Sequence, residues 1–253
     1  MSGLTGRVAL VTGAEVGIGR ATAMALARHG ADVAVHYYSN EAGAKEAAQA
    51  IMTLGRRAAV FQGDLTKNGD VTRVVRSADA HFGRIDILVN NAGGLVGRHS
   101  LTEMSEAFFH DVMNVNVLTT FLCSQAVAPG MIARGAGAIV NLTSLAAHNG
   151  GGPGASVYAA AKAAVLALTK AYAKELAPHG IRVNGVSPGL IGGTPFHKTF
   201  TASEAFAATV KTIPLGRAGT PEDVANVITF LAGPDAAYLT GETIEINGGM
   251  FMR

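Results

Sequence analysis

The sequence predicts an α/β protein built on one doubly wound parallel sheet of about seven strands, with helices on both faces. Short apolar runs rich in β-branched residues alternate with longer alanine-rich segments of helical period. This alternation is the pattern of a parallel sheet that is covered on both sides. The chain has 253 residues and is 49% hydrophobic, which suits one large domain better than two small ones.

The expected elements follow from composition and punctuation. Each strand candidate is a short apolar run that contains Val or Ile, and helix candidates are bounded by residues that favour helix ends. Gly30 and Gly55 follow two of the helices, and Pro221 opens another after Thr220. The expected strands are 7–12, 32–37, 58–62, 85–90, 137–143, 181–187 and 242–247, and the expected helices lie near 20–29, 41–54, 68–82, 103–133, 157–177 and 221–232.

One segment breaks this alternation. Residues 189–213 follow a predicted strand and contain no clear helix or strand pattern. Doubly wound sheets bind ligands beyond the carboxyl ends of their strands, and this segment begins at such an end. We therefore expect a single catalytic, dinucleotide-binding domain over residues 1–253, with a substrate lid at about 189–213.

Composition argues against several classes of function. The formal net charge is +2 and no run of Lys or Arg occurs, so no nucleic-acid partner is expected. No stretch reaches the ~18 to 20 uncharged apolar residues of a membrane span, and the first residues lack a signal-peptide pattern, so we expect a cytoplasmic protein without membrane contact. The one cysteine, Cys123, lies in an apolar run and is expected in the core. The histidines show no metal-ligand spacing, so no metal site is expected.

Three loops after predicted strands carry candidate binding residues. In TGAEVGIGR (12–20), Gly13, Gly17 and Gly19 allow close approach to a pyrophosphate at a helix N-terminus, or serve only a tight turn. Asp64, after the third strand, is placed either to accept a hydrogen bond from an adenine amino group or to form a turn. The stretch NNAGGLVGR (90–98) offers amides and glycines that line a cofactor or close a turn.

Tyr158 and Lys162 are two reactive groups in an alanine-rich segment. On a helix, residues four apart leave the same face one turn from each other. A nearby ammonium group favours the phenolate and lowers the pKa of a tyrosine from its usual value of about 10. Such a phenol can exchange a proton with a substrate oxygen near neutral pH. The alternative is a tyrosine ring that packs on the lysine stem.

Taken together and in order, TGxxxGIG, NNAG, Ser144 after the fifth strand, YxxxK and NGVSPG resemble the short-chain dehydrogenase/reductase family over essentially the whole chain. The resemblance implies a Rossmann-like fold and hydride transfer between a nicotinamide cofactor and a ketone or secondary alcohol. It makes Tyr158 the acid/base, Lys162 its activator and the ribose ligand, and Ser144 the group that binds the reacting oxygen. Asn116, in preference to Asn114, matches the asparagine that holds a water in a proton relay. The alternative class is a non-catalytic dinucleotide-binding redox sensor or structural subunit.

The resemblance also implies a cofactor site. NAD enzymes of the family usually carry an acidic residue where Tyr37 stands, and Ser39 and Asn40 are able to donate to a 2′-phosphate, so NADP is favoured and NAD remains open. Against NADP, Val16 replaces a basic residue that often precedes the second glycine. The residues expected to line the cofactor are Gly13, Glu15, Val16, Gly17, Ile18, Gly19, Tyr37, Tyr38, Ser39, Asp64, Leu65, Asn91, Ala92, Gly93, Tyr158, Lys162, Pro188, Gly189, Ile191 and Thr194. Thr194 comes one residue later than the family threonine, so either the loop bulges at Gly192–Gly193 or another group makes that contact.

Two substrate classes remain open. The chain as a whole is similar to bacterial 3-oxoacyl-carrier-protein reductases, whereas NNAGGLVGR and GGGPGASVYAAAK are more similar to reductases of sugar-derived keto acids such as uronates. Arg98, His148 and His197 fall in loops expected to join Ser144 and Tyr158 at the substrate, where a basic cluster would bind a carboxylate. The alternative is that all three are exposed surface residues. The resemblance further implies a homotetramer formed through the helices near 103–133 and 157–177.

Overall fold

The computed structural model describes residues 3–200 and 202–252, apart from the side chains of residues 196–198. Its centre is a seven-stranded sheet in the order β3-β2-β1-β4-β5-β6-β7, in which neighbouring strands run parallel. This confirms the doubly wound α/β fold predicted from the alternation of segments. The strands are β1 (Val8–Val11), β2 (Asp32–Tyr37), β3 (Ala58–Gln62), β4 (Ile87–Asn90), β5 (Gly137–Leu142), β6 (Ile181–Pro188) and β7 (Thr243–Ile246).

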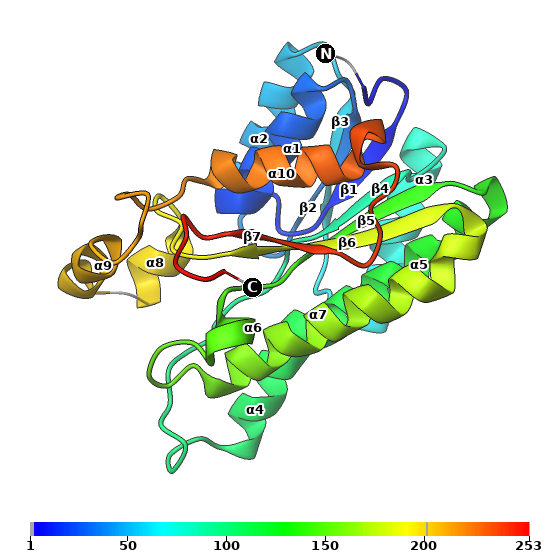
Figure 1. Cartoon of the computed structure of the whole chain (residues 1–253). Coiled ribbons are helices and arrows are strands. Elements are labelled where there is room, and N and C mark those ends of the chain that lie inside the picture. Colours follow the sequence, from blue (N-terminus) through cyan, green and yellow to red (C-terminus); the bar gives the residue numbers. More distant parts are fainter. Residues whose placement is uncertain (1–2, 201, 253) are drawn as a thin grey trace.

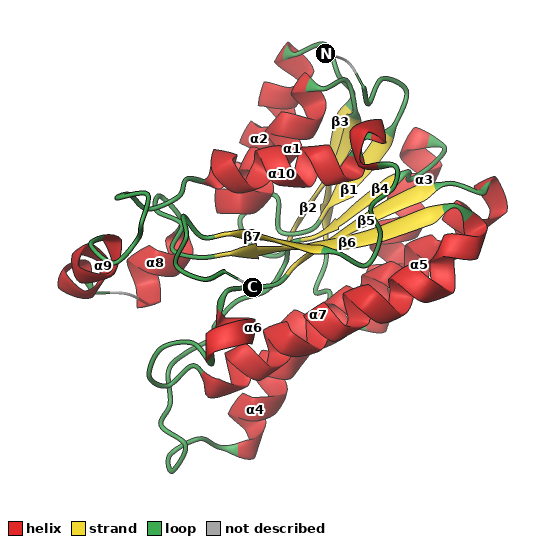
Figure 2. Ribbon diagram, in the orientation of Figure 1, coloured by secondary structure: helices red, strands yellow, loops and turns green. Residues whose placement is uncertain are grey.

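Helices cover both faces of the sheet (Figure 1, Figure 2). One layer holds α1 (Gly17–Arg28), α2 (Glu41–Thr53) and α10 (Pro221–Ala232), and the other holds α3 (Asn68–Phe82), α5 (Thr119–Arg134) and α7 (Ser156–Leu176). Successive residues of β1 point into opposite layers, with Val11 packed in the first and Leu10 in the second. Because both faces are buried, the strand is apolar throughout.

The order of the strands creates a crevice beside β1. The chain runs outward from β1 to β3 and then returns to form β4 on the other side of β1. The loops that leave β1 and β4 therefore diverge at the carboxyl end of the sheet. Such a switch point is where ligands bind in doubly wound sheets.

The predicted helix near 103–133 is a composite of α4 (Glu106–Met113), a π turn (Asn114–Leu118) and α5. By length and composition, the run Glu106–Arg134 is the one helix in the described residues that is apolar enough to cross a membrane, and 44% of its most apolar window is buried. The expectation that no such stretch exists was therefore too strict. Its buried residues, among them Leu122, Val127 and Met131, pack in the core against the sheet, which accounts for the apolar composition.

Several short elements complete the carboxyl end of the sheet. They are α6 (Ala146–Asn149), α8 (Pro195–Phe200) and α9 (Ser203–Val210), with two 3₁₀ turns elsewhere at Ala177–His179 and Pro234–Ala236. The segment 189–213 contains α8 and α9, which lie to one side of the sheet beyond β6 and β7 (Figure 1).

Candidate active site

The loop between β1 and α1 is closed so tightly that only glycine fits at its centre. Gly13 and Gly17 have φ values of 61° and 55°, in the left-handed region that glycine adopts without strain. A Cβ atom on Gly19 would lie 2.0 Å from the carbonyl oxygen of Gly13. Helix α1 begins at Gly17 without a side-chain cap, so its first N–H groups remain available to an anion. These features fit the pyrophosphate of a dinucleotide.

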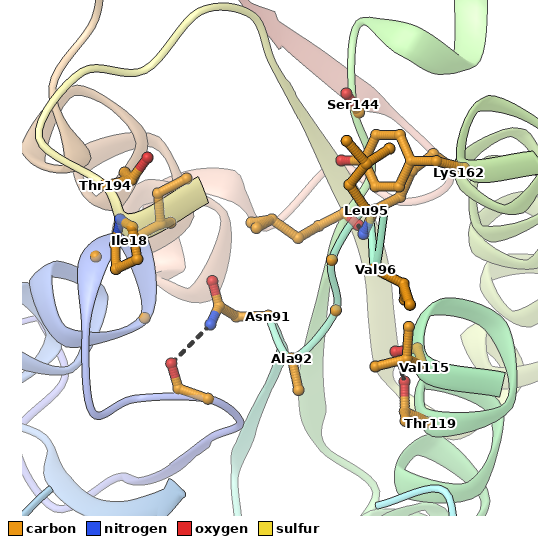
Figure 3. A pocket seen from close by; sticks show the side chains of 18 of the residues that line it. Ile18, Asn91, Ala92, Leu95, Val96, Val115, Thr119, Ser144, Lys162 and Thr194 are labelled. Carbon is orange, nitrogen blue, oxygen red and sulfur yellow. Dashed lines mark hydrogen bonds between the residues drawn. The ribbon is translucent and has the colours of Figure 1, made fainter. Parts of the chain in front are cut away.

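Asn91 ties this loop to the end of β4. Its Nδ2 donates to the carbonyl oxygens of Thr12 and Gly13 at 2.8 and 2.9 Å, and Thr12 Oγ1 accepts from the N–H groups of Asn91 and Ala92. Figure 3 shows Asn91 and Ala92 between two walls of the cavity, with Ile18 and Thr194 on one wall and Leu95, Ser144 and Lys162 on the other. The amide of Asn91 therefore holds the glycine-rich loop against the end of β4.

A cavity of about 880 Å³ opens at the carboxyl end of the sheet. Most of the predicted site residues line it, although they come from loops that are distant in the sequence. Those that line it are Gly13, Glu15, Val16, Gly17, Ile18, Gly19, Tyr38, Asp64, Leu65, Asn91, Ala92, Gly93, Arg98, Ser144, Tyr158, Lys162, Pro188, Gly189, Ile191 and Thr194.

Tyr37 and Ser39 are placed differently from the expectation. Tyr37 is buried, packs in the core on the α1 and α2 side, and is not part of the described cavity lining, and Ser39 is exposed beyond the strand. The physical reason is the alternation of side chains in β2, which points Tyr37 in the same direction as Val33 and Val35. The cavity is lined instead by His36, which the sequence analysis did not select, and by Tyr38.

Asp64 and Thr194 both line the cavity, and each has a side-chain oxygen that already forms a hydrogen bond within the protein. Asp64 Oδ1 accepts hydrogen bonds from the N–H and hydroxyl groups of Thr66, at 3.0 and 2.6 Å, as a turn residue does. Thr194 Oγ1 donates to the carbonyl of Ile191. Gly193, directly before it, has a φ of 72°, and this left-handed residue accommodates the longer loop that the sequence suggested.

The expected basic cluster does not form among the described side chains. Arg98 lines the cavity, whereas His148 is not among the described lining residues; its Nε2 is 3.0 Å from Glu245 Oε1 and its ring stacks on Phe251. The described lining therefore does not support the prediction that His148 faces the substrate, and its partner Glu245 comes from the end of β7, which is distant in the sequence. The side chain of His197 lies outside the described residues.

Ser144, Tyr158 and Lys162 converge at the wall formed by β5 and α7. A hydrogen bond joins the hydroxyl groups of Ser144 and Tyr158. Lys162 Nζ donates to the carbonyl oxygen of Leu142 at 2.8 Å and lies 5.8 Å from the centroid of the Tyr158 ring. Lys162 is only 4% exposed, so its charge is held in place by the end of β5.

The direction of the Tyr158 pKa differs from the sequence-based expectation. Burial raises the pKa of Tyr158 above its usual value, and the hydrogen bond with Ser144 only partly opposes this effect. Burial also lowers the pKa of Lys162 to about 8, so the lysine is itself near the loss of its charge. Tyr158 is thus a protonated acid at neutral pH, which suits the delivery of a proton to a carbonyl oxygen.

Asn116 lies behind the cavity wall, whereas Asn114 lines the cavity. Asn116 is 1% exposed, its Nδ2 donates to the carbonyls of Gly94 and Val112, and its Oδ1 accepts from the N–H of Gly94. A Cβ atom on Gly93 would lie 2.7 Å from Asn116 Oδ1 and 3.3 Å from Lys162 Nζ. Gly93 therefore permits the close approach of these two polar groups.

The pKa values set an expected pH profile. Lys162 loses its proton as the pH rises through about 8, whereas the raised pKa of Tyr158 keeps the phenol protonated over this range. The kcat for carbonyl reduction should therefore fall as the pH rises through this value, because the positive charge beside the reacting groups is lost. Stopped-flow measurement of kcat from pH ~6 to ~10 tests for this fall. A Lys162→Arg variant should not show the fall in kcat. A wild-type kcat that stays constant over the whole pH range would contradict the assignment of the fall to Lys162.

Comparisons with known proteins agree with this geometry. Residues 13–251 match the family model described as enoyl-(acyl carrier protein) reductase. A 3-oxoacyl-[acyl-carrier-protein] reductase of Synechocystis is 41% identical over 253 residues, covering 100% of both chains. The FabG reductase of Staphylococcus epidermidis is 40% identical over 244 residues, covering 96% of this chain and 98% of that protein.

The chain belongs to the short-chain dehydrogenase/reductase family.

Solved structures of other short-chain dehydrogenase/reductases share the whole fold. An NADH-dependent reductase responsible for alginate metabolism superimposes with a TM-score of 0.91 at 33% identity, covering 100% of both chains. A protein from Sinorhizobium meliloti described as a short-chain alcohol dehydrogenase gives a TM-score of 0.92 at 39% identity, covering 98% of this chain and 97% of that one. This short-chain dehydrogenase/reductase is therefore a nicotinamide-dinucleotide-dependent oxidoreductase acting on carbonyl and alcohol carbons, and nothing supports the non-catalytic alternative.

Proposed function

We propose that the enzyme reduces the ketone of a 3-oxoacyl thioester to the corresponding alcohol. The observation that carries this proposal is the pair of hydrogen-bonded hydroxyl groups, Ser144 and Tyr158, on the same side of the cavity as the apolar side chains of Leu95 and Val96. A neutral acyl chain fits such a wall, and the activity named for the Synechocystis and Staphylococcus relatives is of this class.

The side chains divide the chemistry between them. A nicotinamide dinucleotide held by the glycine-rich loop and Lys162 would supply the hydride for this chemistry. Ser144 holds the carbonyl oxygen by a hydrogen bond, and Tyr158 donates its hydroxyl proton to that oxygen as the negative charge develops. Lys162 stabilises the phenolate that remains and binds the nicotinamide ribose. Asn116 holds the Gly93–Gly94 segment against Lys162.

A substrate screen tests the proposal. The purified enzyme is assayed by loss of NADH and NADPH absorbance with a 3-oxoacyl thioester, a sugar-derived keto acid and a simple ketone. The highest kcat/KM is expected for the thioester. If the keto acid is reduced at least about tenfold more efficiently, the second candidate below replaces the first.

The second candidate is reduction of a sugar-derived keto acid. Arg98 lines the cavity, and one of the similar structures is a reductase of alginate metabolism. However, two donors of Arg98 are engaged, because Nη1 donates to the carbonyl of Pro153 at 2.7 Å and Nε to that of Phe200 at 3.2 Å. Arg98 thus joins α8 to the loop before α7, and we rank carboxylate binding second.

Replacing Arg98 with Ala separates the two candidates. If the substrate is a neutral 3-oxoacyl group, Arg98→Ala should change kcat/KM for a keto acid and for its neutral ester by the same factor, because only the contact to α8 is lost. A carboxylate anchor predicts a selective loss for the acid of about 1.5–3 kcal/mol. Arg98→Lys is the matched control, since it retains the charge but not the paired contacts. A selective loss in Arg98→Ala alone would establish the keto-acid candidate.

We further propose that residues 189–213 form the substrate lid of a single domain and that the enzyme is a cytoplasmic homotetramer. The lid proposal is supported by Thr199 and Phe200, which line the cavity from α8. The assembly proposal is supported by the large apolar side chains exposed on α4 and α5, Phe109, Phe121 and Ile132. Light scattering of the purified protein measures the assembly.

A further inference from the structure

We propose that Glu15 makes the enzyme select NADH over NADPH, by accepting hydrogen bonds from the hydroxyl groups of the adenosine ribose. The inference rests on the proposed function as a dinucleotide-dependent reductase. It reverses the preference for NADP that the absence of a carboxylate from the end of β2 suggested.

The glycine-rich loop places the carboxylate of Glu15 beside the end of β2. The glycine-rich loop is attached to the end of β2, because the N–H of Ala14 donates to the carbonyl of His36 at 2.8 Å and that of Gly13 to His36 Nδ1 at 3.1 Å. Glu15 follows in the same loop and lines the cavity. The backbone N–H of Tyr38 donates a hydrogen bond to the carboxylate of Glu15. The glycine-rich loop therefore supplies an acidic group at the place where β2 has none.

The carboxylate of Glu15 lacks a full set of hydrogen-bond donors. Glu15 Oε2 is buried, and no described residue forms a hydrogen bond with it. Burial raises the pKa of Glu15, while its own N–H and that of Tyr38 partly oppose the rise, which is the balance expected of a carboxylate that lacks a full set of donors. A ribose offers two neighbouring O–H donors, and a carboxylate accepts from both. With the Glu15 side chain turned toward the cavity that it lines, the ribose hydroxyls of NADH would supply the donors that this carboxylate lacks.

A 2′-phosphate bound beside Glu15 would need a cation from the residues around it. A 2′-phosphate adds a charge of about −1.5 to −2 and usually needs a basic partner. His36 does not provide one, because its Nδ1 accepts from Gly13, its Nε2 donates to the carbonyl of Gly63, and its pKa is lowered to about 4, chiefly by burial. Arg20, in the first turns of α1, is paired with Glu46 at 3.2 Å.

The remaining basic side chains in the described lining are Lys67, Arg98 and Lys162. Lys162 lies on the wall formed by β5 and α7, and Arg98 lies in the loop after β4, as described above. Lys67 follows β3 and is the one rival for a 2′-phosphate, so it enters the test. In NADPH, the phosphate would instead meet the Glu15 carboxylate, and like charges at close range in a partly buried site repel strongly.

Calorimetric titration tests the inference without any turnover. Dissociation constants are measured for NADH and NADPH, and for ADP-ribose and its 2′-phosphate, which lack the nicotinamide. We expect the wild type to bind each non-phosphorylated ligand at least about tenfold more tightly than its phosphorylated partner. Glu15→Gln should bring each pair to within about threefold, by strengthening the binding of the phosphorylated ligand.

Matched variants make each outcome decisive. Glu222→Gln removes the same charge from the first turn of α10, outside the described cavity lining, and should keep the wild-type ratio. Glu15→Ala serves if the glutamine variant does not fold, and Lys67→Gln should leave the ratio unchanged. A wild type that prefers NADPH, or an unchanged ratio in both Glu15 variants, overturns the inference while the reductase assignment stands. If neither dinucleotide binds, the proposed function itself fails.

Discussion

Tyr158→Phe is expected to lower kcat for carbonyl reduction by at least ~100-fold, the usual contribution of a positioned acid. The ring and its packing on α7 remain, whereas the hydroxyl that is hydrogen-bonded to Ser144 is lost. Dinucleotide affinity should change little, because the glycine-rich loop and the start of α1 are not altered. Steady-state kinetics and calorimetric titration on the same preparation measure both quantities.

Helix α7 provides a matched control for this variant. Tyr172 lies on the same helix, packs in the core, and has a buried hydroxyl without a hydrogen-bond partner among the described residues. Tyr172→Phe removes the same atom far from the cavity, so it should keep full activity and equal or greater stability. If Tyr158→Phe retained activity comparable to that of Tyr172→Phe, Tyr158 could not be the proton donor.

Gly19→Ala is expected to have the largest effect on the cofactor site. The added Cβ would lie 2.0 Å from the carbonyl of Gly13 and 2.5 Å from Asn91 Nδ2, so the loop must open. Overpacking of this kind should lower the free energy of unfolding by about 1–3 kcal/mol. It should also weaken dinucleotide binding by at least about tenfold, since the N–H groups at the start of α1 move. Thermal denaturation and titration measure the two effects.

Gly69→Ala is the corresponding control. Gly69 lies in the first turn of α3, and a Cβ atom there meets nothing within 4 Å. This substitution should leave binding unchanged and raise stability slightly, because alanine favours the helix. Equal dinucleotide affinity in the Gly19→Ala and Gly69→Ala variants would show that the close packing at Gly19 has no role in binding.

Much of the fold was predictable because local pattern and burial agree. The strands of a doubly wound sheet are buried on both faces, so each appears as an apolar run, and the helices between them keep a helical period. The loops after these strands must then meet at one edge of the sheet, and this brings Ser144 close to Tyr158 and Lys162 although β5 and α7 are separate elements. The four-residue spacing was enough to predict that Tyr158 and Lys162 share a helix face, whereas the place of Ser144 beside them came from the family resemblance.

The sequence was less informative where a side chain depends on its long-range surroundings. The alternation in β2 would have indicated that Tyr37 shares a direction with Val33 and Val35, but the family position was given more weight. The contact between His148 and Glu245 depends on how β7 ends beside α6, which no local pattern records. Likewise, the approach of Glu15 to Tyr38 follows from the return of the glycine-rich loop to β2.

The π turn at Asn114–Leu118 has a consequence for the angular phase of the helix that contains it. A π turn holds one more residue than an α turn, so α5 is rotated by about 100° about its axis relative to an uninterrupted continuation of α4. If one helical period is used for all of residues 106–134, the face assigned to the residues of either α4 or α5 will therefore be wrong. Loss of one residue here would restore a regular helix and keep the faces of α4 and α5 in phase, but the side chains inside the turn, Asn116 among them, would change direction. The contacts of Asn116 with Gly94 thus depend on the π turn.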